Sequence, residues 1–329
     1  MKKKYTLKNI FLNICFFISI IAVSFSADAS VQQNTLITNY HSIFVPYYTK
    51  SGSLRIATRM YFREKIPYLL LVNPYTFATE IVSAASVHLQ KVCHPSYCTD
   101  AATSKIKATP YAKALLRYTS PPYLLQNYGI AQADTPVNGV FLTVDMCPSK
   151  KPFEKQFFSR LIAQAKQTGK PVSIAISITG LWAIHHPQEF AWLMQQEKSN
   201  ALKITWINHS FHHPYYVGVP LRENFLLTPS STISHEILDT EKLLIMNGQT
   251  PSVFFRFPGL VSSKALILKL RQFGLIPIAS DAWLAKKQKV KLGSIILVHG
   301  NGNEPQGIKF FTQLQQKNKF RLLPLYQAF

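Results

Sequence analysis

The chain has 329 residues, 47% of them hydrophobic, and a formal net charge of +21 at pH 7. This share of apolar residues excludes an intrinsically disordered chain, because disordered chains have too few apolar side chains to bury a core. The positive charge favours anionic partners, but the cationic residues are scattered and form no basic helix or aromatic-basic motif. Nucleic acid is therefore not the expected partner. General solubility is the alternative explanation of the charge.

The first 29 residues have the organisation of a secretory signal peptide. A cationic start with four lysines precedes an apolar run at 10–25, and Ala27-Asp28-Ala29 supplies the small residues of a cleavage site. The run is shorter than the roughly 20 residues of a spanning helix, and an uncleaved signal anchor is the alternative. We expect an exported protein, periplasmic or secreted. Without the leader's four Lys and one Asp the charge is about +18, which favours an anionic envelope polymer as partner.

Cysteine use agrees with an oxidising compartment. Cys93 and Cys98 are close enough in sequence to close a small disulfide loop. Because Cys15 falls in the leader, Cys147 is then left unpaired. A structural zinc site at Cys93 and Cys98 is not expected, since the chain has no second cysteine pair to complete it.

Residues 30–135 are predicted to form an N-terminal accessory region of unknown role, small, mixed and rich in strand-like segments. The clearest segment is 68–72, an apolar run that ends at the Asn73-Pro74 turn. The polar stretch 131–136 is interpreted as a linker. The region after it, 136–329, is predicted to be a separate domain.

This second region alternates strands with helices. Apolar runs predict strands at 140–144, 172–178, 203–207, 253–255, 275–279 and 295–298. Helical spacing, with glycine or proline at the ends, predicts helices at 153–165, 187–197, 234–246 and 263–273. Repeated units of a strand and then a helix predict an α/β fold with a parallel sheet, closed as a parallel (β/α) barrel. Ligands bind at the carboxyl ends of the strands in such folds.

Polar side chains gather at those strand ends, which core packing alone does not explain. They are Asp145, His209 and His213, Arg256, Asp281 and Trp283, and His299. His209 and His213 are four positions apart, so a short helical turn would place both rings on one face, where they could bind one metal ion. A merely polar histidine-rich loop is the alternative.

Five motifs at 138–320 resemble, in order, those of the polysaccharide deacetylase family, the NodB homology domain of carbohydrate esterase family four. They are Thr143–Pro148, similar to Thr-Phe-Asp-Asp-Gly-Pro; His209–His213, matching His-Ser/Thr-x-x-His; Arg256–Gly259, similar to Arg-x-Pro; Asp281–Trp283, similar to Asp-Trp with one residue inserted; and Ile296–His299, similar to Leu-x-x-His. The ordered set is far more specific than any single motif.

The resemblance implies a metal-dependent hydrolase that removes N-acetyl groups from a glycan, with a divalent metal, usually zinc. It implies the following roles: His209 and His213 as metal ligands, Asp145 as general base, Arg256 as the group that holds Asp145 ionised, His299 as general acid, and Asp281 as its tuning partner. The expected substrate-binding residues are Trp283, Phe257, Pro258 and Tyr215, because apolar and aromatic side chains near the motifs offer surface to sugar rings.

The first motif departs from the family pattern at one ligand. The family's second aspartate, normally the third metal ligand, is Met146 here, and a thioether binds zinc poorly. Cys147 offers a thiolate for a two-His, one-Cys site, or else is a small buried residue. If the site is merely underliganded, Met146→Asp should raise metal affinity. The departure leaves two alternatives to an active deacetylase: a catalytically inactive glycan-binding domain, and a zinc amidase that acts on a peptide.

Overall fold

The computed structural model describes residues 36–84, 90–91, 100–318 and 320–329. The predicted signal peptide and the Cys93–Cys98 pair lie outside these residues, so both stay predictions. Residues 35–329 form one compact unit. Within the described part of the chain, no helix has the length and hydropathy to cross a membrane.

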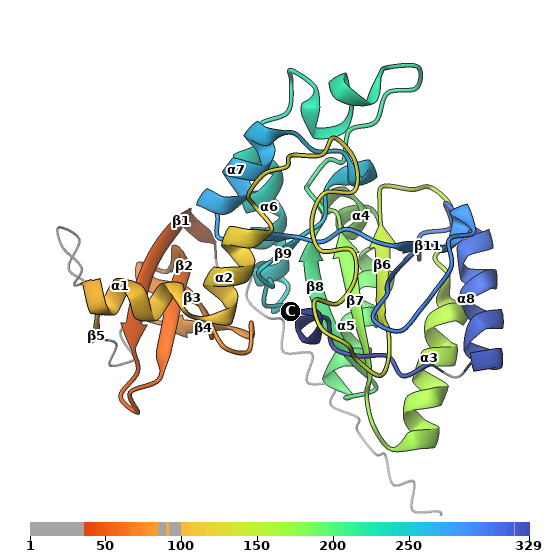
Figure 1. The fold of residues 1–329 in the computed structure, drawn as a ribbon, viewed down its shortest axis with the longest axis horizontal. Coiled ribbons are helices and arrows are strands. Elements are labelled where there is room, and N and C mark those ends of the chain that lie inside the picture. The colour runs from red at the N-terminus through yellow and green to blue at the C-terminus, as the bar shows by residue number, and fades with distance from the viewer. Residues whose placement is uncertain (1–35, 85–89, 92–99, 319) are drawn as a thin grey trace, which may run out of the picture. The chain divides into compact units, whose positions relative to one another are not determined.

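The N-terminal region is built on an antiparallel sheet, shown in red and orange in Figure 1. Its strands, in the order β4-β3-β2-β1-β5, are β1 (Ile37–Tyr48), β2 (Leu54–Arg63), β3 (Ile66–Val72), β4 (Thr79–Ser83) and β5 (Gln90–Lys91). Glu64 and Lys65 both have positive φ, as a two-residue hairpin turn between β2 and β3 requires. Two short helices follow, α1 (Asp100–Lys107) and α2 (Pro110–Arg117). The prediction of a small mixed region before the barrel is confirmed.

The second sheet has seven strands, and every neighbouring pair is parallel. In sheet order they are β10 (Ile276–Pro277), β9 (Phe254–Phe255), β8 (Leu202–Asn208), β7 (Val172–Ile178), β6 (Phe141–Met146), β12 (Ile295–His299) and β11 (Ala282–Trp283). The α/β class and the parallel barrel type are thus confirmed, and the sheet is a half-barrel with β10 and β11 at its edges. Strand β11 was not predicted from the sequence.

Helices connect and cover these strands (Figure 1). They are α3 (Lys155–Thr168), α4 (Gly180–His185), α5 (Pro187–Lys198), α6 (Ile233–Met246), α7 (Lys264–Gln272) and α8 (Pro305–Asn318). The 3-10 turns are η1 (Leu221–Glu223), η2 (Phe225–Leu227), η3 (Pro258–Leu260), η4 (Leu284–Lys286) and η5 (Leu325–Ala328). Helices α3, α5, α6 and α7 match the predicted ones within a few residues. Helices α4 and α8 were missed.

The stretch interpreted as a polar linker is instead hydrogen-bonded into the half-barrel. Ile130 forms a parallel bridge with Ile278, just after β10. The Ala131 carbonyl accepts hydrogen bonds from Asp281 N (3.1 Å) and Ile295 N (3.3 Å), at the start of β12. Residues 130–131 therefore fill the space between the β10 side and the β12 side of the open barrel.

Strand β6 separates two apolar layers. Leu142, Val144 and Met146 belong to the core cluster that also contains the buried faces of α3 and α5, whereas Phe141 belongs to a second cluster. Side chains of a strand alternate between its faces, so Thr143 and Asp145 share the face of Phe141. On this face, the next position along the chain after Asp145 is residue 147 rather than residue 146.

A buried ion pair joins the N-terminal sheet to the half-barrel. Arg59 on β2 donates to both carboxylate oxygens of Glu241 on α6, at 2.6 and 2.8 Å, and to the Phe273 carbonyl at 2.7 Å. Tyr40 OH donates to the same carboxylate at 2.9 Å. Both charged side chains are fully buried, so every polar group must find a protein partner.

Replacing Arg59 with alanine should lower the free energy of unfolding by about 3–5 kcal/mol, because the Glu241 carboxylate would stay buried without its cation. Arg55→Ala is the matched control on the same strand, since Arg55 pairs with the half-exposed Glu80. The control should cost less than about 1 kcal/mol. Urea denaturation of both variants measures the difference, and equal losses would contradict the role given to the buried pair.

Candidate metal centre

The residues after β8 form an irregular turn that holds two histidines together. The predicted helical turn is wrong, because none of residues 209–213 is helical and Ser210 and His213 have left-handed φ of 69° and 50°. Ser210 N donates to Asn208 Oδ1 at 3.0 Å, and His213 N donates to Ser210 Oγ at 3.1 Å. The rings of His209 and His213 nevertheless meet, with centroids 4.8 Å apart. Convergence of the pair is achieved by side-chain hydrogen bonds rather than by helical spacing.

Glu236 on α6 anchors this turn, and the sequence analysis missed it. Its buried carboxylate accepts hydrogen bonds from the backbone N–H groups of Phe211 and His212, both at 2.8 Å. It also lies 3.0 Å from His212 Nδ1. His212 is therefore engaged with Glu236, on the outer side of the turn, while His209 and His213 face each other.

Cys147 completes a group of three possible metal ligands. Its sulfur and one ring nitrogen each of His209 and His213 all lie within 4.8 Å of one another. Cys147 Sγ is 3.5 Å from His209 Nε2. His209 Nδ1 is 2.8 Å from the Arg256 carbonyl, which can only accept, so Nδ1 carries a proton and Nε2 is the nitrogen that a metal ion would bind in the neutral ring. The His209 side chain is thus oriented as a ligand.

The electrostatics favour a thiolate at Cys147. Burial alone would raise the pKa of this thiol, but the charges of His213 and His299 and the hydrogen bond with His209 outweigh it. The pKa of Cys147 therefore lies well below its usual range. Cys147 is a free, buried cysteine among the described residues. Thiolate is the form of cysteine that binds metal.

Three donors of this kind fit a zinc ion. Zinc takes cysteine sulfur at about 2.3 Å and histidine nitrogen at about 2.0–2.1 Å, almost always in a tetrahedron. Such a tetrahedron spaces its ligand atoms by roughly 3.3–3.8 Å. The sulfur–nitrogen distance of 3.5 Å between Cys147 and His209 already falls in this range. Three protein ligands leave the fourth position open, as in catalytic zinc sites.

Met146 points away from these ligands. Its side chain is 0% exposed in the core cluster with Val144 and Phe158, and its sulfur lies beside Gly300. The pleat of β6 explains this, because positions 146 and 147 face opposite sides of the strand. The expectation that an aspartate at position 146 would complete the metal site is therefore corrected: the side chain at position 147, and not that at 146, lies beside His209 and His213.

Met146→Asp should accordingly lower the free energy of unfolding, by about 3–5 kcal/mol, because it places a carboxyl group without a partner in an apolar layer. The control Met146→Leu conserves volume and should cost less than about 1.5 kcal/mol. Thermal or urea denaturation gives both values. Higher zinc affinity in Met146→Asp at unchanged stability would show that position 146 reaches the metal site.

Asp145 and Arg256 form the second part of the site. Arg256 Nη1 donates to Asp145 Oδ1 at 2.7 Å and to Thr143 Oγ1 at 2.6 Å, and Nη2 donates to the Ala279 carbonyl at 3.0 Å. Burial would raise the pKa of Asp145, but the charges of Arg256, His209 and His299 lower it to about 2. The other oxygen, Oδ2, is 3.8 Å from His209 Nε2. The environment of Asp145 therefore favours its ionised form, and the carboxylate lies beside the possible ligands.

His299 stands at the end of β12, and β12 pairs with β6 on the edge of β6 opposite β7 and β8. Strand pairing places His299 level with Asp145. Its Nδ1 is 2.8 Å from Glu304 Oε2, and Trp283 Nε1 donates to the same oxygen at 2.7 Å. Burial alone would lower the pKa of His299, but the Cys147 thiolate and Glu304 raise it well above its usual value. Glu304, which the sequence analysis did not single out, is therefore the carboxylate that contacts His299.

Asp281 is not near His299, contrary to the role that the resemblance gave it. Its oxygens accept hydrogen bonds from Ile295 N at 3.0 Å and Ser294 Oγ at 3.1 Å. These groups stand at the amino end of β12, and four residue steps of about 3.3 Å separate Ile295 from His299. Asp281 therefore caps the start of the strand, and Glu304 takes the position beside the histidine.

The four expected substrate-binding residues differ in exposure. Phe257 is 1% exposed and packs against Phe255 in the core, and Pro258 is also buried, so neither offers a free face to a sugar. Trp283 is partly exposed, but Lys286 Nζ stands 3.6 Å from its ring centroid. Tyr215 is exposed and close to the site. Its ring stacks on the Phe225 ring, whose centroid is 5.8 Å from that of His213.

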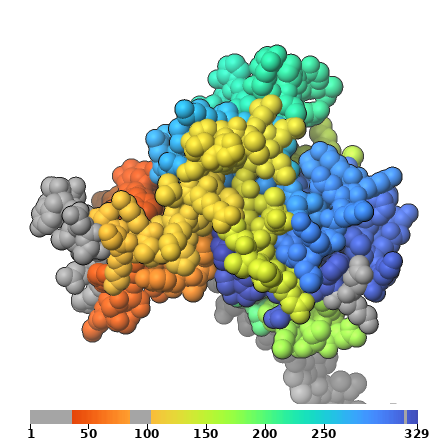
Figure 2. Space-filling model, viewed as in Figure 1, coloured from red at the N-terminus to blue at the C-terminus, as the bar shows by residue number. Residues whose placement is uncertain are grey.

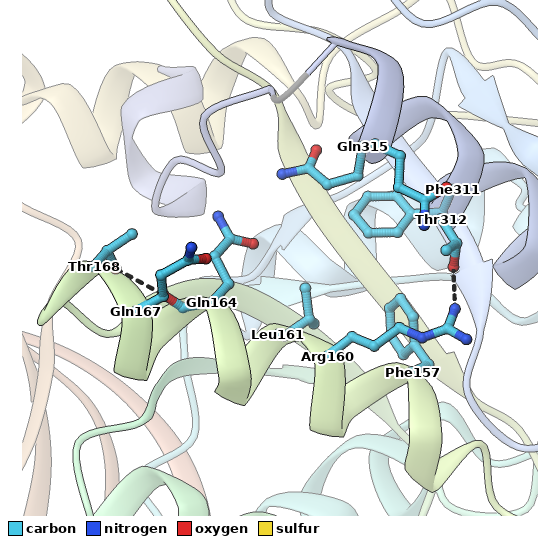
Figure 3. Close-up of a pocket in the computed structure, with 10 residues that line it drawn as sticks. Phe157, Arg160, Leu161, Gln164, Gln167, Thr168, Phe311, Thr312 and Gln315 are labelled. Carbon is cyan, nitrogen blue, oxygen red and sulfur yellow. Dashed lines mark hydrogen bonds between the residues drawn. The ribbon is translucent and has the colours of Figure 1, made fainter.

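A separate groove of about 460 Å³ lies between α3 and α8, with Phe157, Leu161 and Phe311 lining it (Figure 3). The candidate ligands do not line this groove, and neither do Asp145, Arg256 and His299. The groove belongs to the outer layer of the half-barrel and has no part in the site.

Comparisons with known proteins give two kinds of match. Residues 38–112 match the family model of the RP012 protein N-terminal domain, which covers the antiparallel sheet. Three similar solved structures are a family 4 carbohydrate esterase from Bacillus anthracis (18% identity, TM-score 0.43, 65% of this chain and 89% of that chain), the chitin deacetylase from Colletotrichum lindemuthianum (15%, 0.41, 62% and 92%) and a CE4 family pseudoenzyme from Bacillus anthracis (15%, 0.42, 62% and 69%). In motifs and in its parallel half-barrel, this chain resembles the polysaccharide deacetylases.

Proposed function

We propose that this protein is an exported, zinc-dependent hydrolase that removes N-acetyl groups from an envelope or extracellular glycan. The observation that carries the proposal is the convergence of Cys147, His209 and His213 beside an ionised Asp145. Metal-assisted hydrolysis needs a metal site with an open position, a base and an acid in one cleft. The predicted signal peptide supports action in the periplasm or outside the cell.

Each side chain has a distinct task in this reaction. When bound, the metal supplies Lewis-acid polarisation of the acetamide carbonyl and makes water a better nucleophile. Asp145 accepts the proton of the attacking water, and Arg256 keeps it ionised and oriented. His299 donates a proton to the departing amine, and Glu304 holds its ring. Glu236 fixes the turn that carries the two histidines.

The absence of a carboxylate among the possible ligands Cys147, His209 and His213 favours the second candidate, a glycan-binding domain that does not cleave its ligand. A zinc amidase acting on a peptide is the third. The reaction products distinguish these three candidate functions. Acetate release supports the deacetylase, glycan binding without acetate supports the binding domain, and a new amino terminus in a peptide product supports the amidase.

The full chain, loaded with zinc, should release acetate from N-acetylglucosamine oligomers or from peptidoglycan. Asp145→Asn should lower the rate by about 10²–10⁴-fold, because it removes the base. Asp281→Asn is the control, since Asp281 lies at the far end of β12, and it should keep most of the rate. No acetate from any of these substrates, or equal rates in Asp145→Asn and the parent, would overturn the deacetylase proposal.

A further inference from the structure

An exposed apolar loop follows the metal-site turn directly. In residues 215–221, five large apolar side chains face solvent: Tyr215, Tyr216, Val217, Val219 and Leu221. Val217, next to the turn at Gly218, is 87% exposed. The loop stands at the top edge of Figure 1, beyond α4 and α6, and belongs to the teal lobe of Figure 2. Single exposed apolar residues are ordinary, but a cluster of this kind marks an interaction surface.

Hydrogen bonds to the Asn224 side chain hold the backbone of the apolar loop. The buried Asn224 side chain accepts from Tyr216 N at 2.9 Å and donates to the carbonyls of Tyr216 at 2.6 Å and Val219 at 3.1 Å. Val219 N donates to the Tyr216 carbonyl at 3.3 Å. These bonds pair backbone groups inside the loop while its side chains point outward. A segment with paired backbone groups loses less free energy on entering an apolar medium than one with open groups.

One cation adjoins the loop in the sequence. Arg222 ends the loop and has one exposed carboxylate partner, Glu223, at 3.4 Å. The chain as a whole carries +21.

We propose that this apolar loop docks the protein on an anionic lipid bilayer. Tyrosines beside aliphatic side chains, with an arginine at the margin, suit the boundary between lipid headgroups and acyl chains. The positive charge of the chain attracts an anionic leaflet. A second copy of the chain is a poorer occupant, because a stable interface takes roughly 20–30 residues on each side and this loop has far fewer. Resting on the proposed function, the substrate is then a glycan held at a membrane surface.

Hydrogen exchange of the full chain tests this directly. With phosphatidylglycerol vesicles, amides of 215–221 should exchange at least about tenfold more slowly than without vesicles, and phosphatidylcholine should give a smaller effect. Amides around Leu292 should not change, because this exposed residue precedes β12 at the opposite end of the half-barrel. Val217→Asp should abolish the slowing, and the matched variant Leu292→Asp should keep it. The local readout is independent of any tethering by the N-terminal apolar run.

Unchanged exchange of 215–221 on phosphatidylglycerol would overturn the proposal, as would slowing that persists in Val217→Asp. Slowing that appears without vesicles and grows with protein concentration would assign the loop to a second copy of the chain. Acetate release from a soluble oligomer is measured in parallel. Slower exchange of the loop without acetate release would refute the proposed reaction but would still support docking of the loop on the membrane.

Discussion

Cys147→Ala should lower the zinc affinity of the full chain by at least about hundredfold, because loss of one ligand exceeds the 10–100-fold cost of losing an outer-shell partner. The fold should survive, since the side chain is small and stands at the mouth of the half-barrel beside His209 and His213. Competition with a chromogenic zinc chelator measures the affinity. An alanine variant that binds zinc as tightly as the parent would remove Cys147 from the ligand set.

Cys147→Asp separates a metal ligand from a reactive thiol. An aspartate at position 147 faces the two imidazoles and gives a two-His, one-carboxylate set, which also suits zinc. It should restore zinc binding to within about tenfold of the parent and keep acetate release. If Cys147 acted instead as a nucleophile, the aspartate variant would bind zinc and release no acetate.

Arg256→Ala should have the largest effect on stability in the site. The guanidinium is fully buried and donates to Asp145, Thr143 and the Ala279 carbonyl, so its removal leaves a buried carboxylate with no cation in hydrogen-bonding contact. The expected loss is about 3–5 kcal/mol in the free energy of unfolding. Without Arg256, burial becomes the main influence on Asp145 and its pKa rises above the present value of about 2.

Arg256→Lys distinguishes charge from geometry. Lysine keeps the charge but lacks the planar fork that reaches several acceptors at once, so acetate release should still fall by about 10²-fold. Arg160→Lys is the control, because Arg160 makes one exposed hydrogen bond, to Thr312. Full activity in Arg256→Lys would mean that only the charge matters.

Much of the half-barrel could be predicted from the sequence, because its strands and helices are marked by patterns within short segments. The strands at 172–178 and 202–208 are rich in apolar and β-branched residues, and helices α5 and α6 carry their own end signals. These properties depend on residues within one window. Helix α4 and strand β11 escaped prediction because they have six and two residues, too few for a period to show.

Only part of the site was predicted correctly, because its geometry depends on residues that are distant in the sequence. His209, His213, Asp145 and Arg256 do converge at the carboxyl ends of parallel strands. The left-handed turn, however, is held by Glu236, more than twenty residues away, which no local pattern reveals. Asp281 lies at the start of β12 rather than beside His299 because the register of β11 on β12 pairs Ala282 with Ile296.

The choice between Met146 and Cys147 was available from the sequence. Asp145 and residue 147 are two apart on a strand, and side chains at this spacing share a face. The family pattern drew attention to position 146, although alternation along β6 already pointed to 147. Assigning a role to a residue at a strand end therefore requires the alternation of side chains along the strand as well as the family motif.

The measurement that tests the metal centre most directly is zinc X-ray absorption spectroscopy of the purified full chain, loaded with one equivalent of zinc. We expect one sulfur at about 2.3 Å and two imidazole nitrogens at about 2.0–2.1 Å, with the sulfur shell lost in Cys147→Ser. A zinc environment of nitrogen and oxygen alone in the parent, or no zinc retained at all, would contradict the assignment of Cys147, His209 and His213 as the ligands.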